Sequence, residues 1–320
     1  MNKMPVIQVY ALGGTIAMTP GDTSGVTPTL SATDLIRAVP DLQDLAEFRA
    51  ETLVQKGSAN LTFDLIADLC ARAEASDADA IIVTQGTDSM EETSFLASLL
   101  YEGAKPLVFT GAMRTPNQPG ADGPANLLDA ARVALASPRS SVSLVMNGEV
   151  HDPFHVAKEH TSTLLAFASE PGPVAVVVEG HVHWRREARK GMGLRGRPVP
   201  VALLGAALDD DGRLLEEVAA LGYQGLVIEA YGAGHLSEVW AEKAEKLARD
   251  IPVVLASRAR GGRVFENTYG YKGAEIDLIA RGLVPAGGLR GRKARILLAL
   301  LLGSKGADWK QVFTAVTKSV

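Results

Sequence analysis

Short runs of β-branched and aliphatic residues alternate with segments of helical periodicity along this 320-residue chain. This alternation is typical of a largely parallel sheet covered by helices, because parallel strands need a crossover of about a dozen residues, usually a helix. In the first half we expect strands at residues 6–12, 51–54, 80–84, 107–110, 142–146 and 174–178. Helices are predicted between them at residues 31–39, 62–75, 91–100 and 126–136, with Ser31 and Asp34 resembling a capping box and Thr62 suited to an N-cap.

The alternation starts again near residue 199. Strands are expected at residues 199–204, 225–229 and 252–256, and helices at 214–221, 237–249, 290–302 and 308–317. The chain exceeds the roughly 250 to 300 residues at which a single core stops growing. We therefore predict two α/β domains. Residues 1–185 form a larger one with a mostly parallel sheet flanked by helices, 186–198 form a linker, and 199–320 form a smaller domain with a parallel sheet.

The predicted linker is strongly basic. Between residues 184 and 198 six cations face one acid, Glu187; the cations are Arg185, Arg186, Arg189, Lys190, Arg195 and Arg197. We interpret this stretch as a solvated connection between domains, with an RNA contact as the alternative. The whole chain has a net charge of −5, which gives no general reason to expect nucleic acid or an anionic membrane as partner.

Several classes of protein are disfavoured by simple counts. The single cysteine, Cys70, falls in a predicted helix, so neither a disulfide within the chain nor a Cys-based metal site is expected. No apolar run is long enough to cross a bilayer, and residues 1–12 lack the features of a secretory signal, so we expect a cytoplasmic protein. The pairs His151/His155 and His181/His183 lack an obvious third ligand, and no metal site is predicted.

Two turns at predicted strand ends carry hydroxyl groups, and ligands of open α/β sheets bind at such ends. The first turn contains Gly13, Gly14 and Thr15, and the second contains Gly86, Thr87 and Asp88 ahead of a helix. Glycines let a backbone approach a ligand closely, and helix N-termini favour anionic groups. Each turn alone is equally compatible with a threonine that only caps the backbone. Neither has the ending of a phosphate loop or the pattern of a nucleophile elbow.

The two turns together resemble the signatures of the L-asparaginase/glutaminase family, the bacterial-type Thr-dependent amidohydrolases. GGTIA at 13–17 matches the first signature and QGTDSMEET at 85–93 the second. Further matches are GSANLT at 57–62, VFTGAMR at 108–114, DGPANLLDA at 122–130 and VAKEHTS at 156–162, and residues 275–295 resemble the C-terminal segment. The resemblance extends over nearly the whole chain.

The resemblance implies a role for each matched residue. Thr15 is the nucleophile, and Thr87 with Asp88 and Lys158 forms a second unit that handles protons. The residues implied in substrate binding are Gly14, Ser58, Gly86, Thr87, Asp88, Ala112 and Glu275. Ser58 and Asp88 hold the α-carboxylate and α-ammonium groups, and backbone N–H groups at Thr15, Thr87 and Ala112 are candidate oxyanion donors. Glu275 reaches the site of a neighbouring subunit, which implies a homotetramer of intimate dimers.

The implied activity is that of an L-asparaginase. The side-chain amide of L-asparagine is hydrolysed to L-aspartate and ammonia through an acyl-Thr15 intermediate, with glutaminase activity as a secondary activity and without a metal or organic cofactor. The chemistry needs these residue types, because amide hydrolysis requires an activated nucleophile, a proton route to the leaving ammonia and donors aimed at the oxyanion.

Two departures from the family pattern bear on the mechanism. The periplasmic members carry a Tyr in the segment after GGTIA, whereas residues 18–31 contain none. Either another group assists Thr15 or the lid works differently. In YGAGHLS, Ala233 and His235 stand where those members have asparagines.

Two other functions remain open from the sequence. One is an ammonia-producing subunit of a tRNA-dependent amidotransferase. Such subunits usually carry a further domain before the first turn, whereas about six residues precede the first strand here. The other is a non-catalytic amino-acid-binding protein, which would be expected to lose the nucleophile or the lysine.

Overall fold

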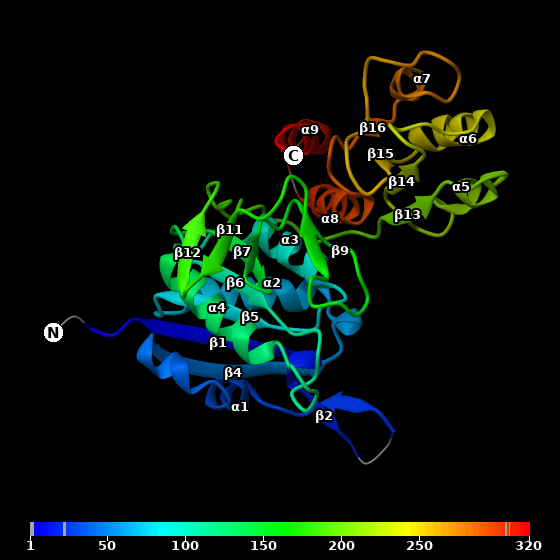
Figure 1. Cartoon of the computed structure of the whole chain (residues 1–320). Helices are drawn as coiled ribbons and strands as arrows, with labels where there is room; N and C mark the ends of the chain where they lie inside the picture. Colours follow the sequence, from blue (N-terminus) through cyan, green and yellow to red (C-terminus); the bar gives the residue numbers. More distant parts are fainter. Residues whose placement is uncertain (1–2, 22–23, 305, 307) are drawn as a thin grey trace. The chain divides into compact units, whose positions relative to one another are not determined.

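The computed structural model describes residues 3–21, 24–304, 306 and 308–320. The chain divides into two compact units between Gly193 and Leu194, inside the stretch in which the sequence places the linker. Each unit has its own sheet and helices (Figure 1), which confirms the predicted class of two α/β domains. The residue limits given for the domains and the linker remain a prediction.

The N-terminal unit is built on an eight-stranded sheet in the order β12-β11-β8-β7-β6-β5-β1-β4. Its parallel part consists of β4 (Glu47–Lys56), β1 (Val6–Gly13), β5 (Ala80–Thr84), β6 (Leu107–Thr110) and β7 (Val142–Met146). The strands β8 (Glu149–His151), β11 (Ala175–Val178) and β12 (His181–Trp184) add an antiparallel edge. The prediction of a mostly parallel sheet is therefore confirmed, although β8 and β12 were not predicted.

Helices bury the central strands of this sheet. Helix α1 (Ala32–Arg37) and helix α4 (Gly123–Ala136) share a core with the sheet, in which Leu35 and Leu127 lie with Ile82. Figure 1 shows α4 lying along the strands. Helices α2 (Phe63–Ala75) and α3 (Met90–Leu100) pack on each other, and α3 also packs against β7. Burial by helices explains why β5 reads AIIVT without polar alternation.

The two N-caps inferred from the sequence are confirmed, whereas the helix expected to begin at residue 126 begins at Gly123. Ser31 forms a capping box with Asp34, in which each side chain accepts from the other residue's backbone N–H. The Thr62 hydroxyl accepts from the N–H of Leu65 at the start of α2. Such a cap satisfies one of the free N–H groups in the first turn of a helix, which stabilises it by about 1 kcal/mol.

Several short elements of the N-terminal unit had no counterpart in the prediction. Two hairpins consist of β2 (Met18–Pro20) with β3 (Val26–Pro28) and of β9 (Val156–Lys158) with β10 (Phe167–Ser169). Three 3-10 helices, η1 (Thr15–Ala17), η2 (Pro40–Asp44) and η3 (Ser58–Asn60), occupy turns. Segments of three to five residues are too short to show a hydrophobic period, so the sequence could not reveal them.

The C-terminal unit has a four-stranded parallel sheet, β13 (Ala202–Gly205), β14 (Leu226–Ala230), β15 (Val253–Ser257) and β16 (Val284–Pro285). Its helices are α5 (Arg213–Glu217), α6 (Glu238–Ala248), α7 (Glu275–Ala280), α8 (Gly291–Leu302) and α9 (Trp309–Thr317). The smaller parallel sheet is as predicted. Helix α7 and β16 were missed, and the helix expected at 214–221 ends at Glu217.

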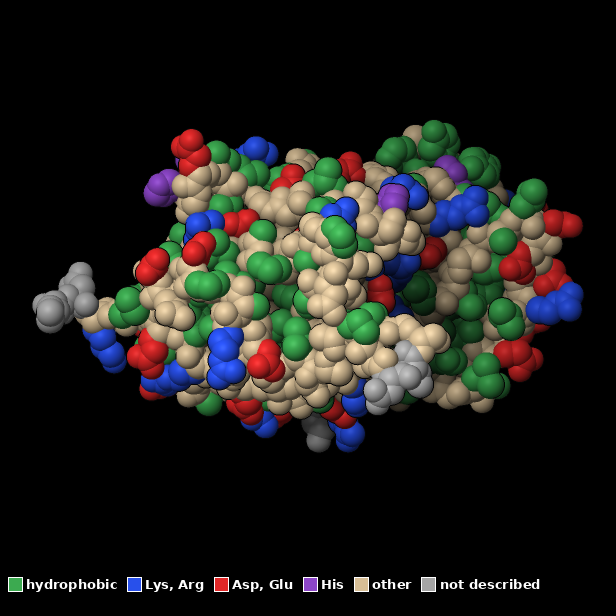
Figure 2. All heavy atoms as spheres, turned by 60° about the horizontal axis from the view of Figure 1, so that its bottom comes forward, with side chains coloured by type: hydrophobic (Ala, Val, Ile, Leu, Met, Phe, Trp, Pro, Cys, Tyr) green, Lys and Arg blue, Asp and Glu red, His purple; other side chains and the backbone are tan. Residues whose placement is uncertain are grey.

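The cysteine and the histidines to which the sequence analysis assigned no function lie in positions that suggest none. Cys70 is buried on α2, and His181 and His183 project from β12 as exposed side chains. Among the described residues no group of three His, Cys, Asp or Glu side chains is placed to hold a metal ion. No helix in the described part of the chain is both long and apolar enough to cross a membrane. On the face in Figure 2, basic and acidic side chains are interspersed.

The packing of β5 generates a prediction about stability. Ile82 is fully buried on β5, so Ile82→Ala should destabilise the N-terminal unit by about 2 to 5 kcal/mol through lost burial and a residual cavity. The matched control is Ile276→Ala, because Ile276 is 41% exposed on α7, and it should cost about 0.5 kcal/mol or less. Urea unfolding followed by circular dichroism measures both. Equal losses in the two variants would contradict the assignment of β5 to the core.

Candidate functional site

The ends of β1 and β5 meet through two glycines. These strands are parallel neighbours, with Ala11 opposite Thr84, so the turns that follow lie at the same edge of the sheet. Gly14 has a φ of 82°, a backbone conformation that favours glycine. A Cβ atom on Gly14 would lie only 2.0 Å from the backbone N of Gly86. The two turns therefore touch along their backbones, and Thr15 and Thr87 each follow a glycine of this contact.

Ser58 joins the turn after β5 from the other side. Its hydroxyl oxygen accepts from the N–H groups of Asp88 at 3.1 Å and Ser89 at 3.3 Å, and the Ser89 hydroxyl donates to the Ser58 carbonyl at 2.8 Å. A Cβ atom on Gly86 would lie 2.9 Å from the Ser58 hydroxyl oxygen. Because the oxygen of Ser58 accepts two bonds, its own O–H hydrogen is left for a further acceptor.

Lys158 reaches the same turn from β9. Its Nζ lies 2.9 Å from Thr87 Oγ1 and 2.6 Å from Asp88 Oδ1, so three of the predicted residues form one hydrogen-bonded group. The side chains of Thr87 and Lys158 are largely buried, whereas that of Asp88 is 74% exposed. A lysine ammonium held by a hydroxyl and a carboxylate at the end of a strand is a compact arrangement for moving protons.

The backbone of Lys158 is held as well. Its N–H donates to Glu91 Oε2 at 2.6 Å, and Glu91 is a buried residue of the first turn of α3. Residues of the segment from Thr87 to Glu91 thus form hydrogen bonds with both the backbone N–H and the ammonium group of Lys158. Sequence reasoning had no role for Glu91, although it lies inside the motif QGTDSMEET. No local pattern singled out Glu91 from its neighbour Glu92; its burial, which a hydrogen-bond partner explains, is seen only in the structure.

The hairpin that carries Lys158 is anchored by contacts of the residues just before it, from the end of β8 onward. His151 Nδ1 lies 2.9 Å from the Ser169 hydroxyl on β10, and Asp152 accepts from the Phe154 N–H at 2.9 Å and from Arg189 Nε at 3.0 Å. Burial alone would raise the pKa of Asp152. The hydrogen bond with His155, the charge of Arg189 and the backbone N–H outweigh it and lower this pKa to about 2.

Ala112 follows β6 and is fully buried next to the second turn. A Cβ atom on Gly111 would lie 2.5 Å from the carbonyl oxygen of Gln85. The Asp122 carboxylate accepts from the N–H groups of Met113 and Arg114, at 2.9 and 2.8 Å, and the Asn126 side chain donates to the Gly111 carbonyl at 3.0 Å. Asp122 and Asn126 therefore fix the loop around Ala112. The sequence had marked their segment only as a match to a family motif.

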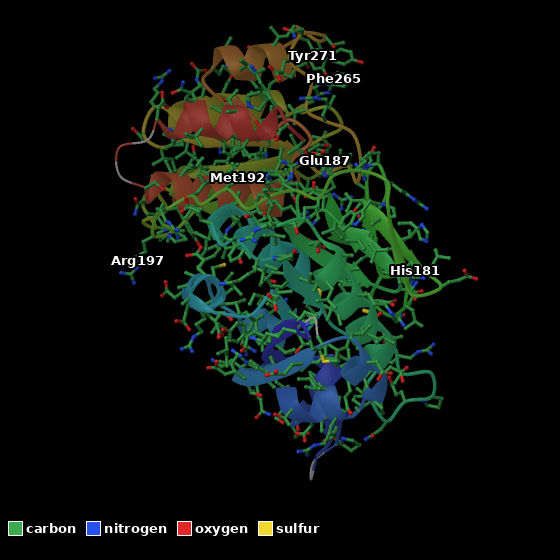
Figure 3. The ribbon with its side chains drawn as sticks, turned by 90° about the vertical axis from the view of Figure 1, so that its left-hand side faces the viewer. His181, Glu187, Met192, Arg197, Phe265 and Tyr271 are labelled. Carbon is green, nitrogen blue, oxygen red and sulfur yellow. The ribbon has the colours of Figure 1, made fainter. Side chains whose placement is uncertain are left out.

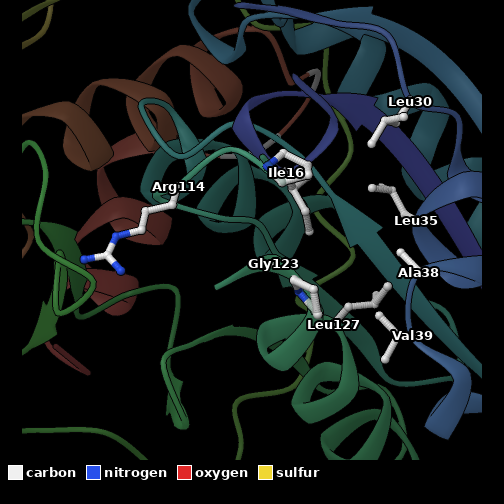
Figure 4. Close-up of a pocket in the computed structure, with 10 residues that line it drawn as sticks. Ile16, Leu30, Leu35, Ala38, Val39, Arg114, Gly123 and Leu127 are labelled. Carbon is white, nitrogen blue, oxygen red and sulfur yellow. The ribbon is translucent and has the colours of Figure 1, made fainter. Parts of the chain in front are cut away.

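Thr15 begins η1, and its neighbour Ile16 is buried. The Thr15 hydroxyl has no hydrogen-bond partner among the residues that the structure describes. Ile16 borders a cavity of about 40 Å³ between η1, α1 and α4 (Figure 4); its other lining residues are Leu30, Leu35, Ala38, Val39, Arg114, Pro116, Gly123, Pro124 and Leu127. This apolar cavity has room for a few water molecules at most and is too small for an amino acid, so we assign it no part in binding the substrate.

Glu275 lies in the C-terminal unit at the start of α7, in a separate set of contacts. It is fully buried and accepts from the N–H groups of Thr268 at 2.8 Å and Tyr269 at 2.6 Å. His235 Nε2 lies 3.2 Å from its other oxygen. Burial raises the pKa of Glu275, but hydrogen bonds from backbone N–H groups and from His235 outweigh it, and the pKa lies below its usual range.

Both halves of the chain match models of one family. The N-terminal asparaginase domain matches residues 6–190, and the glutaminase/asparaginase C-terminal domain matches residues 200–315. The chain is 34% identical over 333 residues to the Deinococcus radiodurans protein named "Probable L-asparaginase", with 98% of each chain covered. It is 31% identical to "L-asparaginase 2" of Escherichia coli, covering 93% of this chain and 89% of that protein.

Two further comparisons add a relative with another name and a solved structure. The chain is 31% identical to a glutamyl-tRNA(Gln) amidotransferase subunit of Methanosarcina acetivorans, over 84% of this chain and 68% of that protein. A crystal structure named "Probable Cytoplasmic L-asparaginase" from Campylobacter jejuni has a TM-score of 0.87 at 26% identity, and the match covers 97% of this chain and 99% of that one.

The lowered pKa of Asp152 generates a prediction about pH and stability. The folded pKa of about 2 lies below the unfolded value of about 3.9, so the ionised carboxylate stabilises the fold above pH ~4 and this contribution is lost as the pH falls toward 2. Asp152→Asn should therefore destabilise the N-terminal unit by about 2 kcal/mol at pH 7. The deficit should shrink between pH 4 and 2.

Chemical denaturation across this pH range measures the effect. Asp129→Asn is the matched control, because burial raises the pKa of Asp129 and its ionisation gives no comparable stabilisation. A deficit in Asp152→Asn that stays constant from pH 7 to 2 would contradict the electrostatic origin.

Proposed function

The chain belongs to the asparaginase family of amidohydrolases, and from this we propose that it is an L-asparaginase that converts L-asparagine to L-aspartate and ammonia. The observation that carries the proposal is the hydrogen-bonded group of Lys158, Thr87 and Asp88 at the turn that contacts the Gly14–Thr15 turn. A non-catalytic amino-acid-binding protein has no need of this buried lysine beside a hydroxyl.

In the proposed reaction Thr15 is the nucleophile. Its oxygen forms a bond to the amide carbon of asparagine while its proton is transferred to a neighbouring base. The tetrahedral intermediate collapses to an acyl-Thr15 ester, and the leaving nitrogen takes up a proton and departs as ammonia. Water then attacks the ester, aided by Thr87 and Lys158, and releases aspartate with the Thr15 hydroxyl restored. Asp88 holds the Lys158 ammonium 2.6 Å away and keeps it aligned with Thr87.

The residues around the turns suit the ends of an amino acid. The remaining O–H hydrogen of Ser58 is available to the α-carboxylate, and the exposed Asp88 carboxylate to the α-ammonium group. The backbone contact of Gly14 with Gly86 brings the turns that carry Thr15 and Thr87 together, and the N–H groups of these two threonines, with Ala112 beside them, are candidate donors to an oxyanion. Each such donor typically lowers the barrier by about 3 to 4 kcal/mol.

Further parts of the proposal concern the assembly and setting of the enzyme. A homotetramer of intimate dimers would bring Glu275 of one copy to the site of another. Glutaminase activity is expected as a secondary activity, and the cytoplasm as the location. The resemblance to a protein named as cytoplasmic supports the location. We expect neither nucleic acid nor a membrane as partner, and no cofactor.

A second candidate function comes from the relatives that are named as glutamyl-tRNA(Gln) amidotransferase subunits. An enzyme of that kind would deliver ammonia to a tRNA-bound substrate, and the basic stretch around residues 185–197 is the feature that would contact RNA. Retention of tRNA on the purified protein that weakens steeply with added salt would favour this alternative. Absence of retention at low salt would argue against it.

The proposed activity predicts ammonia release from L-asparagine and a strong effect of both threonines. Thr15→Ala and Thr87→Ala should each lower kcat by about 10² to 10⁴-fold, because each removes a hydroxyl that acts in the transition state. Thr314→Ala on α9 is the matched control and should keep full activity. Ammonia release is measured with L-asparagine, L-glutamine and D-asparagine. A folded wild-type protein that releases none from any of them would refute the proposal.

Glu91 should position Lys158. Glu91→Ala leaves the Lys158 N–H without its acceptor and should lower kcat by about 10-fold or more with little change in KM, because the lysine acts after the substrate is bound. Glu91→Gln keeps an acceptor oxygen and should restore most of the activity. Glu92→Ala, one position along the same helix, controls for removing a carboxylate. A similar kcat in Glu91→Ala and Glu92→Ala would contradict this role.

A further inference from the structure

A chain of hydrogen bonds in the C-terminal unit runs from a buried carboxylate to an exposed phenol. Glu275 accepts two backbone N–H bonds and is fully buried. His235 Nε2 lies 3.2 Å from Glu275 Oε2, and its Nδ1 lies 3.1 Å from the hydroxyl oxygen of Tyr271. The side chain of His235 is 22% exposed, and Tyr271 is 55% exposed. This series of hydrogen bonds is therefore buried and fixed at the carboxylate of Glu275 and accessible to solvent at the phenol of Tyr271.

The order of these groups is that of a proton relay. An ionised carboxylate only accepts hydrogen bonds, so His235 Nε2 must carry a hydrogen toward Glu275. In the neutral ring Nδ1 is then an acceptor, and the Tyr271 O–H donates to it. This arrangement lets the phenol oxygen take a proton from a neighbour while it passes its own proton to His235. The imidazolium that results is stabilised by Glu275, as in other hydroxyl, imidazole and carboxylate chains.

Aromatic side chains pack around His235 at the surface of the C-terminal unit. The rings of Tyr269 and Tyr271 both pack edge-to-face against His235, with centroids 5.0 and 5.6 Å away. Phe265 is stacked parallel to Tyr269, and both rings are about two-fifths exposed, at 41% and 43%. Figure 3 shows Phe265 and Tyr271 at one end of the C-terminal unit. An exposed group of aromatic side chains is typical of a surface that meets another protein.

The described residues of the N-terminal unit place no group beside Thr15 that could accept the proton of its hydroxyl. The Thr15 hydroxyl has no hydrogen-bond partner within the described part of the chain, and residues 18–31 contain no tyrosine. Lys158 is held by Thr87 and Asp88. His151 lies in a similar setting, with Nδ1 2.9 Å from the Ser169 hydroxyl and Nε2 3.5 Å from Glu149, but its side chain is only 1% exposed and joins β8 to β10. It cannot approach a substrate.

We propose that Tyr271 of one copy of this chain supplies the phenol that activates Thr15 in a second copy. The inference rests on the proposed amidohydrolase function and on the trans role proposed for Glu275. Tyr271 takes the proton of the Thr15 hydroxyl as the Thr15 oxygen bonds to the amide carbon, and Tyr271 passes its own proton to His235. The same path in reverse returns a proton to the leaving ammonia. His235 and Glu275 are positioning residues that act through Tyr271.

Tyr271→Phe tests the phenol with little change in packing. Its kcat should fall by about 10²-fold while KM changes little, because the hydroxyl acts on the nucleophile and not on the bound substrate. His235→Gln should lower kcat in the same way. Tyr223→Phe removes a hydroxyl from another exposed tyrosine of the same unit and should keep full activity. Circular dichroism and melting temperature check that each variant is folded.

Mixing two inactive variants tests whether Tyr271 acts between copies. Thr15→Ala and Tyr271→Phe, expressed separately, should both be nearly inactive. If the two are co-expressed at equal levels, about a quarter of the sites combine an intact Thr15 from one copy with an intact Tyr271 from another. Activity should therefore rise to about a quarter of the wild-type value, far above the mean of the two parents.

The outcomes separate this inference from the proposed function. Failure of the wild-type protein to release ammonia refutes the proposed function itself. An active wild type with an equally active Tyr271→Phe variant overturns the role of the phenol. A strongly impaired Tyr271→Phe variant whose mixture with Thr15→Ala stays at the mean of the parents overturns the action between copies. Recovery to about a quarter supports both parts.

Discussion

The site depends on the contact between two backbones that have no side chains between them. Gly14 and Gly86 stand so close that a single Cβ atom on the first would overlap the second. Parallel strands place their ends at one edge, but the spacing of about 4.8 Å between neighbouring strands normally leaves room for side chains above that edge. Removing these side chains lets the turns close on each other. Ser58, Ala112 and Lys158 then gather around this contact from three other elements.

The sequence was informative where a pattern repeats and where a cap has a fixed spacing. The strand β5 and the helix α2 were predicted because AIIVT is an unbroken buried run and because Thr62 precedes an apolar helical period. The hairpin β9–β10 was not, because its strands have three residues each. Lys158 lies on that hairpin, so nothing local in the sequence connected it to Thr87. Only the resemblance to a family suggested the pair.

The supporting residues were the least predictable part. Glu91, Asp122 and Asn126 each hold a backbone group close to the site, and their partners come from segments distant in sequence or from the far side of a loop. A buried polar side chain is stable only when such a partner exists, but its identity follows from the tertiary fold. The contact of Tyr271 with His235 could not be predicted either, because these residues are brought together by the tertiary fold. A pattern of residues can predict where hydroxyl groups lie, whereas their partners need coordinates.

The bond between Lys158 and Thr87 has a consequence for synthesis of the protein. These residues are 71 positions apart in the sequence. The ammonium group can therefore contact the hydroxyl only after the intervening segment has been synthesised and the hairpin has packed against the turn. A nascent chain that ends before the hairpin contains the segments of β1, β5 and their two turns but does not yet contain Lys158. The hydrogen-bonded group at the site therefore forms late, when the tertiary structure is complete. A partly synthesised polypeptide contains both threonines but not the lysine.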